Sequence, residues 1–339
     1  MKQWLLKYKK ILAAVSGLLF ILFCFYLYSF TFDFSGSQAP AWGVTFSVKY
    51  AKELDLDWQE AYLAILDDLK ASHIRLIAYW DEIERRRGIY NFTGLDWQIS
   101  QAASRGVNII LTVGRRTPRW PECHDPVWLA NLMPETINQS QFALVKTLIE
   151  RYKDQPAIKA WQVENEPLLS VFGQCPKPDK NLLAEEIKLV KSLDQRPIIT
   201  TDSGELSGWQ KAANYPDILG TTMYRIVWNK YFGFLDYFFV PPAFYHFKAG
   251  LTGYFHPNLK KVIVTELQME PWTMNRPMVF LTLAEQEQSF NLKRFRDNIG
   301  FVKKTGLPEV YLWGAEYWYW LLEQGRPEIW DEARKLWAD

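Results

Sequence analysis

Two glutamates stand where short apolar runs end, and their positions indicate one kind of chemistry. Glu166 follows the run at residues 158–164, and Glu266 follows the run at residues 262–265. A carboxyl group at the C-terminal end of a buried strand is held rigidly at the mouth of a sheet. Two such groups can face one bond from opposite sides, one as a proton donor and one as a carboxylate. Cleavage of a glycosidic bond requires this pair of groups.

Eight short apolar runs could form the sheet that positions these carboxyl groups. The runs cover residues 42–48, 74–79, 107–113, 158–164, 197–201, 218–223, 262–265 and 310–313. Stretches with apolar residues three and four apart, such as 58–70 and 182–193, lie between most of them. This alternation predicts an α/β fold with a parallel sheet, and eight such units predict a single (β/α)8 TIM barrel over residues 42–339. No glycine-rich dinucleotide fingerprint follows the first run, which disfavours a Rossmann fold.

Residues 11–31 form a separate, almost wholly apolar segment. About twenty helical residues at ~1.5 Å each span the ~30 Å hydrocarbon core of a bilayer. The segment follows Lys2, Lys7, Lys9 and Lys10, whereas the first charge after it is Asp33. This asymmetry predicts a transmembrane signal-anchor with residues 1–10 in the cytoplasm, residues 32–41 as a linker and the barrel outside the cytoplasm. A cleaved signal peptide is the alternative, although its apolar region normally has only about 7 to 15 residues.

The residues around the two glutamates resemble a known family. Asn165-Glu166-Pro167 after the fourth run, with Glu266 after the seventh, is similar to the retaining glycoside hydrolases of clan A. These are cellulase-like (β/α)8 barrels of family 5 and their β-galactosidase-like relatives, and the resemblance covers roughly residues 40–335. It implies that Glu166 is the general acid/base and Glu266 the nucleophile in double-displacement hydrolysis of a β-linked oligosaccharide or polysaccharide. No cofactor is expected.

Four further residues match positions that support this chemistry in clan A. The resemblance implies that Arg75 and Tyr224 support the nucleophile, by charge and by a hydrogen bond. It also implies that Asn165 binds the sugar hydroxyl beside the scissile bond and that Trp313 floors the sugar subsite. Structural roles are the alternatives: an ion pair within the barrel, packed aromatic rings, or a turn residue.

The match departs from the clan pattern in places that concern the substrate. Many clan members carry histidines near the ends of strands 3 and 6, where this chain has Gly-Arg-Arg at 114–116 and Thr222. Residues 80–92 are more similar to the β-galactosidase-like branch than to true cellulases. Of the neighbouring acids, we expect Glu164 to point the same way as Glu166 but deeper in the barrel, and Glu270 to be a weaker nucleophile candidate.

Cys123 and Cys175 lie in the loops after the third and fourth runs, and neighbouring strands present neighbouring loops. In an exported chain an even pair of this kind predicts a disulfide. Two free buried thiols are the alternative. The third cysteine, Cys24, lies within the apolar segment.

Several other functions are disfavoured by composition. The formal net charge of +1 leaves no nucleic-acid footprint, and the four histidines include no close pair at metal-ligand spacing. A Gly-x-Ser-x-Gly elbow, as in serine esterases, is absent from the sequence. Two readings remain open beside hydrolysis: a membrane-tethered carbohydrate-binding protein on an inactive barrel, and a transglycosidase that uses the same residues.

Residues 226–260 break the regular alternation and are dense in aromatic side chains. Because loops after barrel strands open on the catalytic face, we expect some rings, such as Trp228 and Tyr231, to line sugar subsites beyond the cleavage point. The alternatives are a hydrophobic cap over the barrel and a surface that docks on the membrane.

Overall fold

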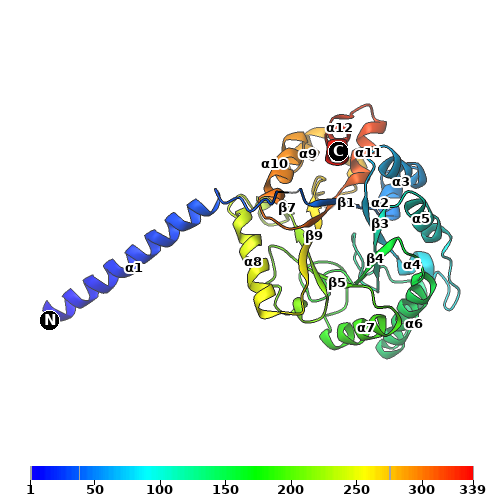
Figure 1. The fold of residues 1–339 in the computed structure, drawn as a ribbon, viewed down its shortest axis with the longest axis horizontal. Helices are drawn as coiled ribbons and strands as arrows, with labels where there is room; N and C mark the ends of the chain where they lie inside the picture. The colour runs from blue at the N-terminus through cyan, green and yellow to red at the C-terminus, as the bar shows by residue number, and fades with distance from the viewer. Residues whose placement is uncertain (1, 38, 275, 339) are drawn as a thin grey trace.

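A long N-terminal helix and a closed barrel make up the chain (Figure 1). The structure is a computed structural model that describes residues 2–37, 39–274 and 276–338. Residues 1, 38, 275 and 339, which belong to the segments expected from the sequence, lie outside the described residues.

Within the described ranges, eight parallel strands close into the barrel in the order β1-β10-β9-β6-β5-β4-β3-β2. The strands are β1 (Ala41–Thr45), β2 (His73–Ile77), β3 (Asn108–Val113), β4 (Ile158–Val163), β5 (Ile198–Asp202), β6 (Ile218–Met223), β9 (Lys261–Gln268) and β10 (Glu309–Trp313). Each of the eight predicted runs overlaps one of these strands, so the predicted (β/α)8 barrel is confirmed. The seventh run is longer than predicted, and Glu266 lies inside β9 rather than after it.

Helices surround the barrel strands and cover their outer face (Figure 1). They are α2 (Val48–Glu53), α3 (Trp58–Asp67), α4 (Trp80–Ile83), α5 (Thr93–Ser104), α6 (Pro134–Tyr152), α7 (Lys180–Leu193), α8 (Pro242–Phe255), α9 (Leu283–Glu287), α10 (Leu292–Lys303), α11 (Ala315–Glu323) and α12 (Glu328–Arg334). In α7, the N-cap Asp179 accepts hydrogen bonds from two backbone N–H groups, and Leu183, Ile187 and Val190 face inward. Their spacing of four and three residues places them on one face of the helix, as packing against a barrel requires.

The barrel interior away from the mouth is filled by apolar side chains from six strands. They are Ile110, Ala160, Ile199, Ile218, Ile263 and Tyr311. Gly43 on β1 makes room for this layer, because a Cβ atom there would lie 2.6 Å from the ring of Tyr311. The packed layer leaves polar side chains such as Arg75 to occupy the interior nearer the mouth.

The N-terminal segment is one continuous helix, α1 (Lys2–Ser29), that projects away from the barrel (Figure 1). Its residues Ile11–Ser29 have a mean hydropathy of 2.4 and are exposed over most of their length. Near the end of the helix, the Tyr26 hydroxyl donates to the Phe239 carbonyl at 2.7 Å. Among the described residues, this is the single helix that is long and apolar enough to cross a membrane. The predicted apolar segment ended at residue 31, two residues beyond the end of the helix.

The aromatic stretch at 226–260 folds into a hairpin and a helix. Strands β7 (Ile226–Asn229) and β8 (Gly233–Asp236) pair antiparallel, and α8 follows them. The hairpin exposes Tyr231 and Phe232 at its tip, whereas Trp228 is half-buried. The stretch therefore takes the place of an ordinary connection between β6 and β9.

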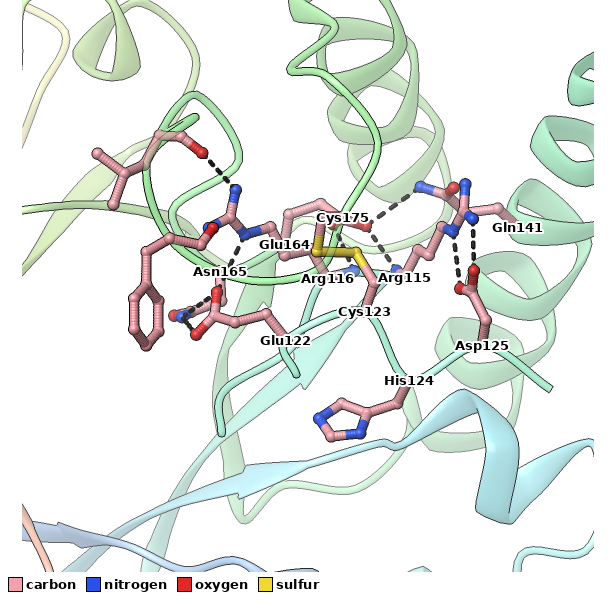
Figure 2. The surroundings of a disulfide bond; sticks show 12 residues. Arg115, Arg116, Glu122, Cys123, His124, Asp125, Gln141, Glu164, Asn165 and Cys175 are labelled. Atoms are coloured by element: carbon pink, nitrogen blue, oxygen red, sulfur yellow. Dashed lines mark hydrogen bonds and ion pairs between the residues drawn. A yellow bond between two sulfur atoms is a disulfide. The ribbon is translucent and has the colours of Figure 1, made fainter. Parts of the chain in front are cut away.

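A disulfide joins Cys123, in the loop after β3, to Cys175, in the loop after β4 (Figure 2). The two cysteines are 52 residues apart in the chain, and their Cα atoms are 5.3 Å apart. The bond closes a loop that contains all of α6 and β4. It therefore restrains two neighbouring segments at the mouth of the barrel.

We predict that removing this bond destabilises the protein without affecting the apolar helix. A Cys123→Ser/Cys175→Ser variant should lose about 2 to 4 kcal/mol of unfolding free energy, because the unfolded chain gains loop entropy. Urea denaturation of the full chain in mild detergent measures the loss, with Cys24→Ser as the matched control. Equal stability of all three proteins, or free thiols at both positions in the exported protein, would contradict the prediction.

Candidate active site

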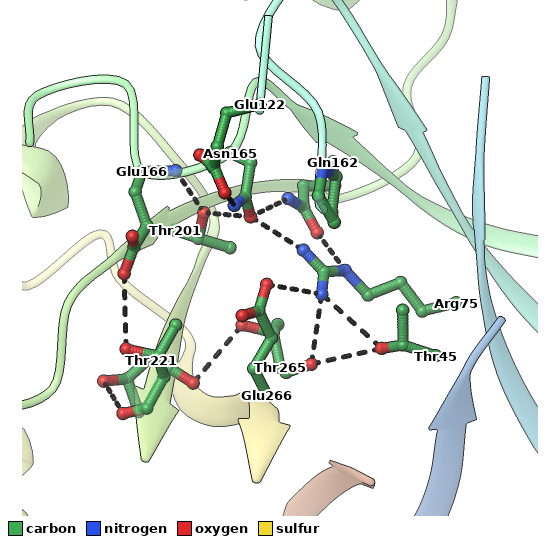
Figure 3. Close-up of polar contacts among 12 residues, drawn as sticks. Thr45, Arg75, Glu122, Gln162, Asn165, Glu166, Thr201, Thr221, Thr265 and Glu266 are labelled. Carbon is green, nitrogen blue, oxygen red and sulfur yellow. Dashed lines mark hydrogen bonds and ion pairs between the residues drawn. The ribbon is translucent and has the colours of Figure 1, made fainter. Parts of the chain in front are cut away.

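Glu166 is presented by a tight turn immediately after β4 (Figure 3). Glu164 and Glu166 have φ angles of 60° and 43°, a region that side chains other than glycine rarely adopt. Hydrogen bonds to both neighbouring strands fix the turn: the Glu164 N–H donates to the Val113 carbonyl at 2.9 Å, and the Glu166 N–H to Thr201 Oγ1 at 2.7 Å. Such strained backbone persists only where its surroundings hold it, and it is common at active sites.

The turn sends Glu164 away from the barrel interior, which corrects the expectation that it points the same way as Glu166. Its carboxylate accepts hydrogen bonds from the Arg115 and Arg116 N–H groups, at 2.6 and 2.7 Å, and from Gln141 of α6 at 3.1 Å (Figure 2). Gly114 contacts this carboxylate so closely that any Cβ atom would collide with it. Glu164 therefore secures the loop after β3 against α6 and plays no part in the mouth.

Glu266 lies on β9 with a donor for each of its carboxylate oxygens (Figure 3). Arg75 Nη1 donates to Oε1 at 3.0 Å, and the Tyr224 hydroxyl donates to Oε2 at 3.0 Å. Both Glu266 and Arg75 are buried, so little water competes for these bonds. Hydrogen bonds between a charged donor and a carboxylate are stronger than neutral ones, so they hold Glu266 in one orientation.

Arg75 connects three strands across the barrel and is 0% exposed. Its Nε donates to Gln162 Oε1 on β4 at 2.7 Å, and its Nη1 to the Thr265 carbonyl on β9 at 3.2 Å. Its Nη2 donates to Asn165 Oδ1 at 2.8 Å. A planar fork of donors can meet several acceptors at once in this way, which a lysine cannot. The guanidinium therefore links the turn that carries Glu166 to the strand that carries Glu266.

Glu166 is in a different electrostatic environment from Glu266. Its Oε1 accepts a hydrogen bond from Thr222 Oγ1 at 3.2 Å, at the position where the resemblance led us to look for a histidine. Burial raises its pKa well above the ordinary range, and the negative charges of Glu122 and Glu266 raise it further. A carboxyl group with a raised pKa keeps its proton near neutral pH and can act as an acid.

Asn165 occupies the centre of the polar network between the two glutamates. Its Oδ1 accepts from Arg75 and, at 3.2 Å, from the Thr201 hydroxyl. Its Nδ2 faces the Glu122 carboxylate at 3.4 Å. The structure thus brings Asn165 together with the predicted site residues, with its amide oxygen facing protein donors and its NH2 group facing Glu122.

Trp313 lies at the end of β10, as the sequence predicted, but its ring is stacked against a guanidinium. The Arg119 Cζ atom lies 4.0 Å from the Trp313 ring centroid and 3.7 Å from that of Tyr50. Arg119 also forms ion pairs with Glu270 and with Glu316, the latter at 3.6 Å. This pairing assigns Glu270 to a charge cluster around Arg119, apart from the donors that surround Glu266.

Sequence reasoning missed Glu122, a third buried carboxyl group in the site. It is paired with Arg116 at 3.0 Å and stands beside Cys123 of the disulfide (Figure 2). Burial, together with the negative charge of Glu266, raises the pKa of Glu122 to about 7 against the opposing effect of Arg116. The pair of arginines at 115–116 was the one sequence feature that could have suggested a buried acidic partner.

No group of three or more histidine, cysteine, aspartate or glutamate side chains within the described ranges could hold a metal ion. The described mouth presents the carboxyl groups of Glu166 and Glu266, the Arg75 network and the Arg119 cluster. This arrangement can donate a proton from Glu166 and present a carboxylate at Glu266.

We predict that Arg75 has a large effect on stability as well as on activity. Arg75→Met leaves Glu266 as a buried carboxylate without its cation, which should cost about 3 to 5 kcal/mol of unfolding free energy. Urea denaturation followed by near-UV circular dichroism measures the cost. The control Arg296→Met removes an arginine whose partner Glu332 is at the surface, and it should leave stability nearly unchanged. Equal effects of both substitutions would refute the central role of Arg75.

Curated relatives match less than half of this chain. No family model matches the chain. The chain is 26% identical over 171 residues to the β-galactosidase LacZ of Lactobacillus acidophilus, covering 45% of this chain and 25% of that enzyme. It is 28% identical over 116 residues to the mannan endo-1,4-β-mannosidase F of Aspergillus clavatus, covering 32% of this chain and 26% of that enzyme. The matches thus span about a quarter of these curated relatives.

Solved structures match over more of the chain. A GH5_18 protein of Bifidobacterium longum, in complex with Manβ1-4GlcNAc, has a TM-score of 0.58 at 13% identity, covering 81% of this chain and 68% of that one. The xylanase XynB of Paenibacillus barcinonensis has a TM-score of 0.53 at 14% identity, covering 81% and 83%. Identities this low show the fold alone. The relatives and the structural neighbours are glycoside hydrolases, and the resemblance of this chain to the barrel glycoside hydrolases of clan A is confirmed.

Proposed function

We propose that the protein is a retaining glycoside hydrolase that cleaves β-linked glycans through Glu166 and Glu266. The observation that carries the proposal is the contrast between the two buried carboxyl groups. Burial and neighbouring negative charge favour the protonated form of Glu166, whereas Arg75 and Tyr224 donate to a Glu266 carboxylate. When one carboxyl group is surrounded by negative charge and the other by hydrogen-bond donors, the first is suited to act as the acid and the second as the nucleophile.

In the first step, Glu166 gives its proton to the oxygen of the leaving sugar as the glycosidic bond breaks. The Glu266 carboxylate attacks the anomeric carbon from the other side and forms a covalent glycosyl-enzyme. Glu166 is now a carboxylate and takes a proton from water in the second step. The water oxygen then displaces Glu266 and restores both groups to their starting states.

The neighbouring side chains position these two groups. Tyr224 and Arg75 hold the Glu266 carboxylate in one orientation, and Thr222 does so for Glu166. The Asn165 NH2 group, which has only long bonds to Glu122, is the donor best placed to bind a sugar hydroxyl. The relatives' names indicate β-linked galactosides and mannans as substrate classes to test first.

We also propose that α1 is an uncleaved membrane anchor with the barrel outside the cytoplasm. Its apolar residues Ile11–Ser29 are exposed over most of their length, so a bilayer is the environment that suits them. The disulfide Cys123–Cys175 supports an oxidising compartment for the barrel, because such bonds persist outside the cytoplasm.

We predict that hydrolysis retains the anomeric configuration. Retention follows from double displacement. Glu266 attacks the anomeric carbon from one face and water then attacks it from the other, so the configuration is inverted twice. Proton NMR of the first-formed product on an aryl β-glycoside decides this before mutarotation. An inverted anomer would overturn the assignment of Glu266 as nucleophile.

We predict different losses for the two carboxyl groups. Glu266→Ala should abolish turnover, and azide should restore it as a glycosyl azide of the opposite anomeric configuration. Glu166→Ala should slow the second step but spare bond cleavage when the leaving group needs no proton.

We also predict a pH dependence. In the wild type, kcat/KM for substrates with poor leaving groups should fall as the pH rises through the raised pKa of Glu166, because the proton of the acid is then lost. Glu166→Ala should remove this alkaline limb.

Glu186→Gln is the matched control for these variants. Glu186 is a buried glutamate whose carboxyl accepts a hydrogen bond from Gln141 of α6, away from the mouth. A glutamine there keeps an acceptor for that bond, so activity should be unchanged. Wild-type rates in Glu166→Ala and Glu266→Ala would overturn the catalytic roles of both glutamates. Sugar binding without turnover by the wild-type chain would indicate a carbohydrate-binding barrel, and products joined to an added sugar acceptor would indicate a transglycosidase.

A further inference from the structure

The outward face of α8 is apolar along its whole length. Within this fully described helix, the exposed large side chains are Phe244, Phe247, Leu251, Tyr254 and Phe255. Their spacing of three and four residues places them in one stripe on the side away from the barrel. The outward face of a helix around a water-soluble barrel is normally polar, so this stripe needs a covering surface.

The one lysine of α8, Lys248, meets the stripe only at its first ring, where its ammonium lies 5.1 Å from the Phe244 centroid, and its hydrogen bonds go to the barrel side. The Lys248 ammonium donates to the carbonyl oxygens of Gly204 and Ser207, both at 2.7 Å, and lies 4.1 Å from the Trp209 ring. By contrast, the outward face of α10 carries exposed charges, among them Lys293 and Arg296. The lack of exposed charge on α8 is therefore not a general property of the outer helices.

The segment before α8 extends the apolar surface. The hairpin tip exposes Tyr231 and Phe232, and the connection to α8 exposes Phe238 and Phe239. Together with the five α8 residues, these four form what we term the aromatic face. Tyr254 at 81% and Phe232 at 84% exposure are its most accessible members.

The aromatic face adjoins the end of α1. The Tyr26 hydroxyl donates to the Phe239 carbonyl at 2.7 Å, which fixes the last turns of α1 beside this segment. After α1, the Phe34 ring stacks on His246 at a centroid distance of 3.7 Å and meets Phe247 edge-on at 5.5 Å. In Figure 1 α1 leaves the barrel beside α8, and α8 runs across the direction of α1.

We propose that the aromatic face is a membrane-docking surface, which lies in the interfacial layer of the bilayer that α1 spans. The proposal rests on the anchor proposed above. A bilayer around α1 ends close to Ser29, within a few residues of the contacts between Phe34 and α8. Apolar area removed from water there contributes about 25 cal/mol per Å². Tyrosine and phenylalanine side chains also suit this layer, where one end of a ring meets headgroups and the other meets acyl chains.

Docking through this face would fix the position of the active site. The hairpin follows β6, so it belongs to the rim of the mouth, together with Tyr224. The catalytic mouth then lies beside the bilayer on its β6 side and faces glycans close to the membrane surface. For the exposed rings of residues 226–260, we therefore propose contact with the membrane in place of the expected role in sugar subsites.

The test places a fluorescent probe on the full chain in vesicles of phosphatidylcholine and phosphatidylglycerol. In a Cys24→Ser background, Phe232→Cys and Tyr254→Cys are labelled with an environment-sensitive dye, while the bonded Cys123 and Cys175 do not react. Val127→Cys, at a position that is 90% exposed and lies after β3, is the matched control. Nitroxide lipids should quench the dye at 232 and 254 and shift its emission to the blue, and should leave the dye at 127 unchanged.

A second variant separates lipid contact from folding. Phe244→Ser/Phe255→Ser changes two exposed rings, so thermal stability and activity on a soluble aryl glycoside should stay at wild-type levels while quenching at 232 and 254 is lost. Chain that floats with the vesicles but shows no quenching at either probe overturns docking and leaves the anchor intact. Chain that does not float overturns both. The same blue shift of the dyes at 232 and 254 in detergent without vesicles, increasing with protein concentration, would show that a second copy of the chain covers this face. That result would overturn docking on lipid.

Discussion

The rest of the site depends on a single buried charge. Burying a cation costs several kcal/mol unless it is paired and hydrogen-bonded, and Arg75 has no exposed surface. Its position is therefore stable only if Glu266 supplies the opposite charge and Gln162 and Asn165 supply acceptors. The same requirement fixes those side chains in turn. A geometry that an enzyme needs for chemistry is thus enforced by the electrostatics of the fold.

This constraint also divides the carboxyl groups at the mouth. Arg75 forms an ion pair with Glu266, and Arg116 forms one with Glu122. Arg119 forms ion pairs with Glu270 and Glu316. Among the described residues, no guanidinium lies within ion-pair distance of Glu166, and burial and the surrounding negative charge raise its pKa and favour its protonated form. Glu166 therefore differs from Glu266, which has Arg75 beside it. This difference is the basis for proposing Glu166 as the acid and Glu266 as the carboxylate. The departure from histidine to threonine at 222 fits this division, because a hydroxyl donates to Glu166 without adding charge.

The sequence predicted the barrel and the pair of glutamates because both follow from local patterns. Period and length identify strands, and in a parallel barrel the carboxyl ends of all strands open on one face. Glu166 and Glu266 could therefore be placed at one mouth before their contacts were known, whereas Arg75 was identified through the resemblance to clan A. Glu122 and Arg119 could not be placed, because they lie in the loop after β3, where Arg116 and the rings of Tyr50 and Trp313 fix their positions. No periodic pattern encodes contacts of this kind.

By itself, the sequence determined eight strands, an apolar N-terminal segment long enough to cross a bilayer, and two acids at strand ends. Each is a property of neighbouring residues. Only the tertiary structure decided which way an acid points: φ of 60° at residue 164 turns Glu164 outward, and the next turn brings Glu166 to the mouth. It alone also placed α8 against the end of α1. The physical reason is that these arrangements depend on contacts between segments that are distant in sequence, and such contacts exist only once the barrel has closed.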